Sequence, residues 1–327
     1  MKKDALLKLL AEHTDTYISG AELARLLSVS RTAVWKGIEA LREEGYRIDS
    51  VTNRGYRLSS ESDVLSADGI AQYLKTGGIR LQAYPTVSST NTVLKSQAAE
   101  GAPEGSVIAA AEQTAGRGRM GRSFFSPPGS GLYLSILLRP RTSAAETTRL
   151  TAYAAVAVAE AIEGLAEVET QIKWVNDVYV DGKKVCGILT EASLDCERGM
   201  TDYAVVGIGI NTRAPEGDFP PELREIAGAA FSGKTVPALR CRLAAAVVDR
   251  FFTFYRDELP DTAGYCFEAY RRRSLVLGRH IRLHAFERPA EDAEALDIAP
   301  DFALLVRDSS STVRRVSSGE VSVRLPE

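Results

Sequence analysis

The sequence predicts an α+β protein with three parts: an N-terminal winged helix-turn-helix, a central domain of strands and helices, and a small C-terminal β-barrel. Three observations predict this class. Short helical patterns and a hairpin pattern come first, apolar strands alternate with helices through the middle, and short strands follow one another from residue 272 onward. The expected boundaries within the 327 residues are 1–60, 65–270 and 271–327.

Composition narrows the possible classes of protein. With 45% hydrophobic and 25% charged residues, the chain has the content of an ordinary soluble protein. Its net charge of -3 provides no global basic field, so any contact with nucleic acid has to come from a local patch. Four cysteines without C-x-x-C spacing and only three histidines disfavour a zinc site and predict free thiols in a reducing cytoplasm. No signal peptide and no membrane span is expected.

Two short helices are expected to open the N-terminal part. Residues 2–12 alternate leucines with Lys and Glu, which is typical of an amphipathic helix. Ser19, followed three residues later by Glu22, forms a capping box that predicts a second helix over 21–27.

A third helix and a hairpin complete the winged helix. Ser30 is the expected N-cap of a helix over 31–44, which Gly45 ends. Two short strands over 46–58 then form the wing. The side chains that we expect on DNA phosphates and base edges are Ser30, Arg31, Thr32, Trp35, Lys36 and Arg54. A helical docking module with a solvated charged face is the alternative.

The central part follows a polar linker over 59–63. A short helix over 65–74 and a strand over 79–85 precede a helix that runs to Glu100. The residues at the start of that helix either cap it or bind the polar head of a ligand at its N-terminus. They are Ser89, Thr90 and Asn91.

A Gly/Arg loop at Gln113–Arg122 is the most distinctive segment. Three glycines alternate there with three arginines: Gly116, Arg117, Gly118, Arg119, Gly121 and Arg122. Glycine lets a backbone approach a ligand, and backbone N–H groups beside guanidinium groups form an anion cradle. Strand patterns over 106–112 and 131–138 flank the loop, so we expect it to be positioned against a phosphate-bearing small molecule. A flexible basic loop or an RGG-like segment for nucleic acid is the alternative.

Polar residues interrupt a later expected strand, over 171–180, which follows an Ala/Val-rich helix over 144–163. Lys173, Asn176 and Asp177 break its apolar alternation, as happens at a strand end that faces a ligand.

A type I′ turn at Asp181–Gly182 is expected to lead into the next strand, over 183–191. One of its two lysines, Lys183 or Lys184, is expected to point inward. A glycine-containing strand over 203–210 follows, where the missing side chains let something approach the sheet.

Helices are expected to dominate 220–258, and a strongly amphipathic one is expected over 244–255. The strands expected in the last part are 274–277, 280–284, 302–306, 312–316 and 319–323.

Four motifs together resemble the family of bifunctional biotin protein ligases that also repress the biotin operon. They are Gly116–Arg122, Lys173-Trp-Val-Asn-Asp177, Lys184-Val-Cys-Gly-Ile188 and Gly207-Ile-Gly-Ile-Asn211, and the resemblance covers nearly the whole chain. It implies a central mixed-sheet domain of the biotin/lipoate ligase type and an SH3-like barrel. It also implies an enzyme that makes biotinyl-5′-AMP and diphosphate from biotin and ATP, then transfers biotin to a lysine of a biotin carboxyl carrier protein.

The resemblance also assigns roles to residues. Lys184, Arg117 and Arg119 are the implied catalytic residues, because two anionic reactants have to be neutralised. The implied biotin site comprises Ser89, Thr90, Asn91, Gln113, Gly116, Arg117, Lys184 and Gly187. The implied ATP and adenylate site comprises Arg119, Arg122, Phe124, Asn176, Asp177 and Asn211. Mg²⁺ would accompany ATP; its protein ligands are unknown, with Asp177 as a candidate.

A repressor of this family would bind operator DNA as a homodimer, with the adenylate as corepressor. Alternatives stay open: a ligase without DNA-binding regulation, a non-catalytic biotin-sensing transcription regulator, and a lipoate ligase of the same fold. Two departures from the family pattern are Val175, where the family usually has Pro, and Asp297–Phe302, which replaces glycines between two strands of the last domain.

Overall fold

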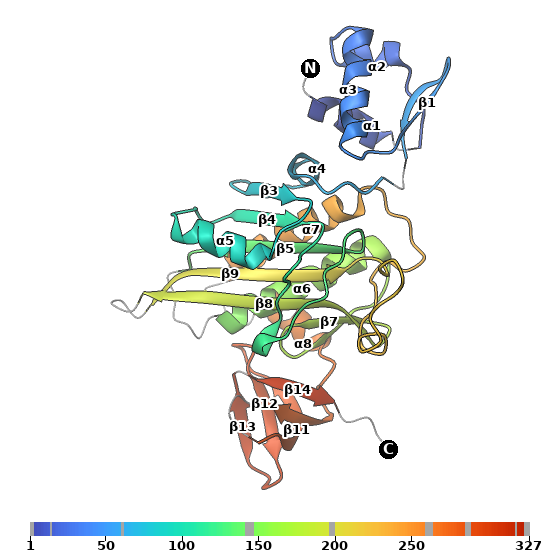
Figure 1. Cartoon of the computed structure of the whole chain (residues 1–327). Coiled ribbons are helices and arrows are strands. Elements are labelled where there is room, and N and C mark those ends of the chain that lie inside the picture. Colours follow the sequence, from blue (N-terminus) through green and yellow to red (C-terminus); the bar gives the residue numbers. More distant parts are fainter. Residues whose placement is uncertain are drawn as a thin grey trace.

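A computed structural model describes residues 3–13, 15–59, 62–140, 147–195, 200–258, 264–284, 289–317 and 319–323. The predicted α+β class is confirmed. Figure 1 shows the winged helix (blue) and the C-terminal sheet (red) at opposite ends of the central sheet. The domain boundaries remain predictions.

The N-terminal part is a winged helix with a core of its own. Its elements are α1 (Lys3–Glu12), α2 (Gly20–Leu26), α3 (Arg31–Glu43), β1 (Ile48–Val51) and β2 (Gly55–Leu58). The Ser19 and Ser30 side chains cap α2 and α3, as predicted, by accepting backbone N–H groups at 3.1 Å. Leucines of α1 pack with Val34 and Ile38 of α3 in a separate hydrophobic cluster. The two strands pair antiparallel as the wing.

The central part is built on a seven-stranded mixed sheet in the order β3-β4-β5-β9-β8-β7-β6. Only β3 and β4 pair in parallel, and the other described ladders are antiparallel. The strands are β3 (Arg80–Tyr84), β4 (Ser106–Ala110), β5 (Gly131–Leu138), β6 (Gln171–Lys173), β7 (Asp177–Val180), β8 (Lys183–Asp195) and β9 (Met200–Asn211).

Helices cover the two faces of this sheet unequally. The Ala/Val-rich α6 packs with α7 on one face, in the largest core cluster, whereas α5 packs on the other face against Ile108, Leu137 and Val205. The helices are α4 (Ala67–Ala71), α5 (Thr90–Ala99), α6 (Thr147–Ala166), α7 (Leu239–Thr253), a π-helical turn (Phe254–Glu258) and α8 (Tyr265–Arg272). The predicted start of α6 at 144–146 lies outside the described residues. No helix in the described ranges is long and apolar enough to cross a bilayer.

The prediction of a single strand over 171–180 is wrong. The segment is a hairpin in which β6 and β7 pair through Lys173 and Asp177, and a turn lies between them. The turn places Trp174 in the core, where the side chain is 2% exposed and its Nε1 donates to the Phe302 carbonyl oxygen at 2.9 Å. A tertiary contact that is distant in sequence therefore overrides the local strand pattern.

Two other predictions need correction. Helix begins only at Leu239 within the segment 220–258, because prolines and glycines before it favour turns. Residues 274–277 form no strand in the described structure; Ser274 makes an isolated bridge to Ile172.

The C-terminal part is a five-stranded antiparallel sheet in the order β13-β12-β11-β10-β14. Its strands are β10 (His280–His284), β11 (Glu291–Ile298), β12 (Leu304–Asp308), β13 (Val313–Val316) and β14 (Glu320–Val323). The sequence did not predict β11, because acidic residues and a bulge between Ala295 and Asp297 disrupt its alternation.

No ladder joins β13 to β14 among the described residues, so the predicted barrel is not closed. The two edge strands are nevertheless successive in the chain. The segment from Val316 to Glu320 can span a distance of at most about 15 Å. The edges of a flat five-stranded sheet would be about 19 Å apart. The sheet therefore has to curl toward a barrel.

Candidate active site

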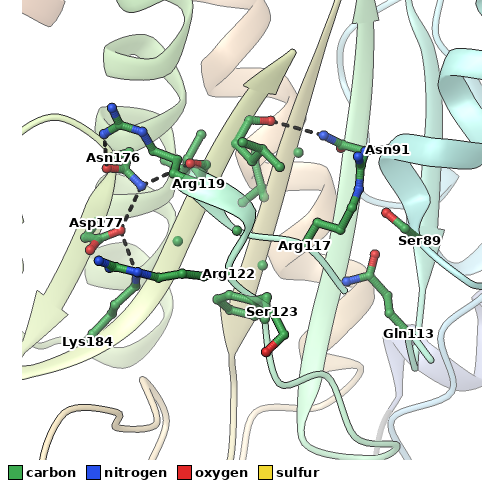
Figure 2. A pocket seen from close by; sticks show the side chains of 18 of the residues that line it. Ser89, Asn91, Gln113, Arg117, Arg119, Arg122, Ser123, Asn176, Asp177 and Lys184 are labelled. Carbon is green, nitrogen blue, oxygen red and sulfur yellow. Dashed lines mark hydrogen bonds and ion pairs between the residues drawn. The ribbon is translucent and has the colours of Figure 1, made fainter. Parts of the chain in front are cut away.

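One cavity gathers most of the residues predicted from the motifs. It lies on the α5 face of the central sheet, between the N-terminus of α5, the Gly/Arg loop and the β6–β7 hairpin (Figure 2). The predicted residues that line it are Ser89, Thr90, Asn91, Gln113, Arg117, Arg119, Arg122, Phe124, Asn176, Asp177, Lys184 and Gly187. The others are Gly118, Ser123, Lys173, Trp174, Ile188, Leu189, Gly207, Ile208, Gly209 and Val321.

Glycines of β8 and β9 form the floor of the cavity. Gly187 pairs with Gly209 across the two strands. A Cβ atom on Gly209 would lie 2.6 Å from the Phe124 ring, and one on Gly207 would lie 2.2 Å from Asn91 Oδ1. The expectation that these glycines let other groups approach the sheet is confirmed, and the groups are Phe124 and Asn91.

The Gly/Arg loop is a compact hairpin-like turn. The Phe124 N–H donates to the Gly116 carbonyl oxygen at 2.9 Å, and the Gly118 N–H donates to that of Arg122 at 2.7 Å. Gly121 closes the turn with a φ of 74°, in the left-handed region that glycine tolerates. The loop is therefore positioned over the sheet, as its flanking strands predicted.

The arginines of the loop point in two directions (Figure 2). Arg119 and Arg122 extend toward the side of Asn176 and Asp177, whereas Arg117 extends toward Asn91. Arg119 Nη1 donates to Asn176 Oδ1 at 2.9 Å. The loop thus supplies positive charge to both ends of the cavity.

Lys184 is the lysine that points inward, and it forms an ion pair with Asp177 (Nζ–Oδ1 2.7 Å). A bulge in the β7–β8 ladder, opposite Tyr179, sets its direction. Lys183 instead donates to the carbonyl oxygen of Arg224 on the outer surface. Asn176 holds the Asp177 carboxylate from the other side, since its Nδ2 donates to Asp177 Oδ1 at 2.9 Å.

A polar network forms the end of the cavity near α5. Gln113 Oε1 accepts a hydrogen bond from the backbone N–H of Thr90 at 2.8 Å and lies 3.1 Å from the Thr90 hydroxyl. The fully buried Ser135 hydroxyl joins Thr90 Oγ1 at 2.8 Å and donates to Asn91 Oδ1 at 2.6 Å. Ser89 occupies the N-cap position of α5, but its side chain makes no capping hydrogen bond among the described residues. This geometry favours the ligand-binding interpretation of Ser89.

Two predicted site residues lie outside the cavity lining. Gly116 lies at the base of the loop, where a Cβ atom would come within 2.4 Å of the Phe124 carbonyl oxygen. Asn211 ends β9 opposite Gly131. Sequence reasoning missed Glu191, which contacts Arg117, although period-two alternation from Gly187 along β8 places it on the same face.

The residues predicted to contact DNA are all on the surface of the winged helix. Ser30, Arg31, Thr32, Trp35 and Lys36 occupy the exposed side of the start of α3, and the Trp35 side chain is 52% exposed. In the wing, the guanidinium of Arg54 stacks on the Tyr17 ring, 4.6 Å from its centroid. The opposite side of α3 packs in the core.

Comparison with known proteins agrees with the structure of the central part and with that of the N-terminal winged helix. Residues 83–211 match the biotin/lipoate A/B protein ligase family, and residues 2–57 match a helix-turn-helix domain. The chain is 35% identical to the bifunctional ligase/repressor BirA of Bacillus subtilis, over 99% of this chain and 98% of that protein. This protein belongs to the family of bifunctional biotin ligase/repressors. Every residue that lines the cavity except Val321 falls within the ligase match.

Other members of the biotin ligase family match in part. The BirA protein of Escherichia coli is 35% identical over 59% of this chain and 59% of its own length. A solved structure of the biotin protein ligase from Aquifex aeolicus in complex with biotin and ATP has a TM-score of 0.61 and 27% identity. The match covers 75% of this chain and 98% of that structure.

Proposed function

We propose that this protein is an ATP-dependent biotin protein ligase that also represses transcription from operator DNA. The observation that carries the ligase proposal is the cavity itself. Its floor is a part of the sheet where glycines replace larger side chains. This floor lies between a polar pocket at one end and Lys184, Arg119 and Arg122 at the other. An apolar molecule with a polar head and an anionic tail fits this arrangement, with nucleotide phosphates at the positively charged end.

In the first step, the biotin carboxylate attacks the α-phosphorus of ATP. A carboxylate-oxygen–phosphorus bond forms, the bond to the β-phosphate oxygen breaks, and diphosphate leaves. Both reactants are anionic, so the enzyme has to neutralise them as they approach. Lys184 is the side chain that we place between carboxylate and α-phosphate, with Asp177 orienting its ammonium at 2.7 Å. Arg119 and Arg122 bind the phosphates.

The remaining side chains orient the two substrates. Ser89, Thr90 and Gln113 provide hydroxyl and amide groups suited to the ureido group of biotin. The Phe124 ring, which lies against Gly187 and Gly209, provides an apolar wall. In the second step, the amine of the acceptor lysine attacks the acyl carbon of biotinyl-5′-AMP, AMP leaves, and the amine loses a proton.

Magnesium enters this proposal with ATP, where it would offset charge on the phosphates. Asp177 is the one carboxylate among the described residues that line the cavity. No cluster of three or more His, Cys, Asp or Glu side chains suited to a metal occurs in the described part of the chain. Such an ion would be held mainly by phosphate oxygens and water, with Asp177 as the candidate protein ligand through the carboxylate oxygen that Lys184 does not contact.

The repressor proposal rests on the exposed start of α3, where Arg31 and Lys36 flank Trp35. We expect α3 to enter a major groove and the wing residue Arg54 to contact the DNA backbone. We also propose that the adenylate favours a homodimer that binds operator DNA. The protein would meet ATP, DNA and the carrier protein in one compartment, the cytoplasm.

Incorporation of labelled biotin into a biotin carboxyl carrier domain, with ATP and magnesium, tests the ligase proposal. We expect Lys184→Ala to slow adenylate formation by about 10²–10³-fold, the usual loss for a group that stabilises transition-state charge. Lys183→Ala is the matched control, because the neighbouring side chain faces away from the cavity. If the wild-type protein binds biotin but biotinylates no carrier, the protein is a biotin sensor without ligase activity.

A further inference from the structure

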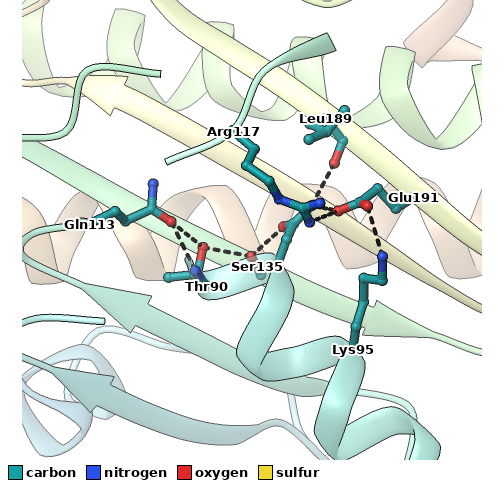
Figure 3. Close-up of polar contacts among 8 residues, drawn as sticks. Thr90, Lys95, Gln113, Arg117, Ser135, Leu189 and Glu191 are labelled. Carbon is teal, nitrogen blue, oxygen red and sulfur yellow. Dashed lines mark hydrogen bonds and ion pairs between the residues drawn. The ribbon is translucent and has the colours of Figure 1, made fainter. Parts of the chain in front are cut away.

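Glu191 provides a partly buried anchoring point that none of the proposed catalytic steps uses. It lies on β8, on the same face as Gly187, and its side chain is 21% exposed. Its Oε2 accepts hydrogen bonds from Arg117 Nη2 at 2.6 Å and Asn91 Nδ2 at 2.9 Å (Figure 3). Its Oε1 accepts from Lys95 Nζ at 2.8 Å. One carboxylate therefore joins the Gly/Arg loop to α5.

The contact with Asn91 extends the polar network of the cavity to the loop. A carboxylate only accepts hydrogen bonds, so Asn91 has to present its NH₂ group to Glu191 and its carbonyl oxygen to Ser135. Ser135 contacts the Thr90 hydroxyl, and the Thr90 backbone N–H donates to Gln113 Oε1. The chain of contacts thus runs without a break from the pocket that we assign to the biotin head to Arg117 (Figure 3).

The bond to Glu191 uses one of the five N–H groups of Arg117. The other edge of the guanidinium keeps donors for an anion in the cavity. We propose that Glu191 is a positioning residue for biotin activation: it anchors Arg117 over the cavity and couples the orientation of Arg117 to the biotin-head pocket. This inference rests on the ligase proposed above. It predicts two effects of Glu191→Gln, which keeps the shape but removes the charge and one acceptor oxygen.

The first effect concerns the ligand-free protein. Arg117, Arg119 and Arg122 are trypsin sites, and cleavage there requires the loop to open. We expect Glu191→Gln to increase the cleavage rate in this loop about fivefold, as followed by mass spectrometry. Glu191→Asp, which keeps the charge, should restore part of the protection. Lys95→Met is the matched control, because Lys95 contacts the other oxygen and not the loop.

The second effect concerns catalysis. We expect the KM for biotin in adenylate formation to rise about tenfold in Glu191→Gln while kcat stays within about twofold, since the variant loses ground-state positioning and keeps Lys184. In an Arg117→Gln background, Glu191→Gln should change neither the remaining loop cleavage nor KM. A purely structural role for Glu191 would instead give additive effects.

The inference would be overturned if Glu191→Gln showed wild-type protection of the loop and an unchanged KM for biotin. It would also be overturned if Glu191→Gln had the same effects in the Arg117→Gln background as in the wild-type protein. The cleavage assay needs no substrate. A protein without ligase activity but with the expected protection pattern would therefore refute the ligase proposal while leaving the anchoring role of Glu191 intact. If Glu191→Gln is too unstable to purify, Glu191→Asp, made alone and in the Arg117→Gln background, carries the same test.

Discussion

Arg119 Nη2 donates a hydrogen bond of 2.8 Å to the backbone carbonyl oxygen of Gly319, which joins the Gly/Arg loop to the C-terminal sheet. The same guanidinium bonds Asn176 through Nη1, so one side chain spans two acceptors from different parts of the chain. Val321, two residues after Gly319, also lines the cavity. The C-terminal sheet is therefore part of the site.

Arg119→Lys should raise the KM for ATP about tenfold, because an ammonium keeps the charge but cannot span both acceptors as the planar fork does. Steady-state rates of adenylate formation at varied ATP measure this. Arg80→Lys on the exposed β3 residue is the control. Unchanged kinetics in Arg119→Lys would show that the bond to Gly319 is irrelevant to nucleotide binding.

Gly209→Ala should weaken biotin binding at least about tenfold, since the new methyl group would overlap the Phe124 ring, now 2.6 Å from that position. Isothermal titration with biotin measures the change. Gly164→Ala is the control, because a Cβ at this position in α6 meets nothing within 4 Å. That substitution should stabilise the helix by about 0.5–1 kcal/mol. Equal biotin affinity of the two variants would contradict the proposed floor.

Arg31→Ala and Lys36→Ala should each weaken operator binding and reduce the salt dependence of the affinity. Each phosphate contact that is lost lowers the slope of log K against log salt by about 0.9. Fluorescence anisotropy at several salt concentrations measures this, and biotinylation by both variants should equal that of the wild type. Lys8→Ala on the exposed side of α1 is the control. An unaltered slope in both variants would favour the protein-docking alternative for the winged helix.

Glu163→Gln should destabilise the fold by about 1–2 kcal/mol, because the largely buried Arg273 loses its nearer carboxylate partner at 2.6 Å and keeps only Glu160 at 4.0 Å. Burial raises the pKa of Glu163, but hydrogen bonds from Arg273 and Thr170 outweigh it and hold the pKa below its usual 4.5. The contribution of Glu163 is therefore present above pH 4.5 and is lost as the pH falls through the lower pKa of the folded state.

Urea unfolding of the wild type and of Glu163→Gln at pH 7 and at successively lower pH measures this contribution. The difference in unfolding free energy between them should shrink with acidity. Glu167→Gln, whose side chain is 88% exposed, is the control. A difference that stays constant down to acid pH would refute the assigned role of the ion pair.

Local patterns predicted the parts of this protein whose structure is decided locally. Caps at Ser19 and Ser30, the Gly/Arg loop between two strands, and the Asp181–Gly182 turn all follow from short-range chemistry. The motifs also identified most of the cavity lining. The β6–β7 turn depends instead on the burial of Trp174 against Phe302, a contact that no local pattern contains.

Contacts between distant segments were also beyond the sequence patterns. Glu191 reads locally as the polar end of a strand, and only the packing of α5 and the loop against β8 gives it three partners. The role of Gly319 as an acceptor is carried by its backbone, which every residue type possesses, so the sequence contains no sign of it.

The separate core of the winged helix has a consequence for the order in which the protein matures. A nascent chain leaves the ribosome from its N-terminus, and domains generally fold as units as they emerge. The buried core residues of the winged helix all lie at or before Leu58, and only the partly buried Val64 packs on them from just beyond it. The cavity, in contrast, lacks Val321 and the acceptor for Arg119 until the last strand has been made. We therefore expect each newly made molecule to have its DNA-reading surface well before it can synthesise an adenylate.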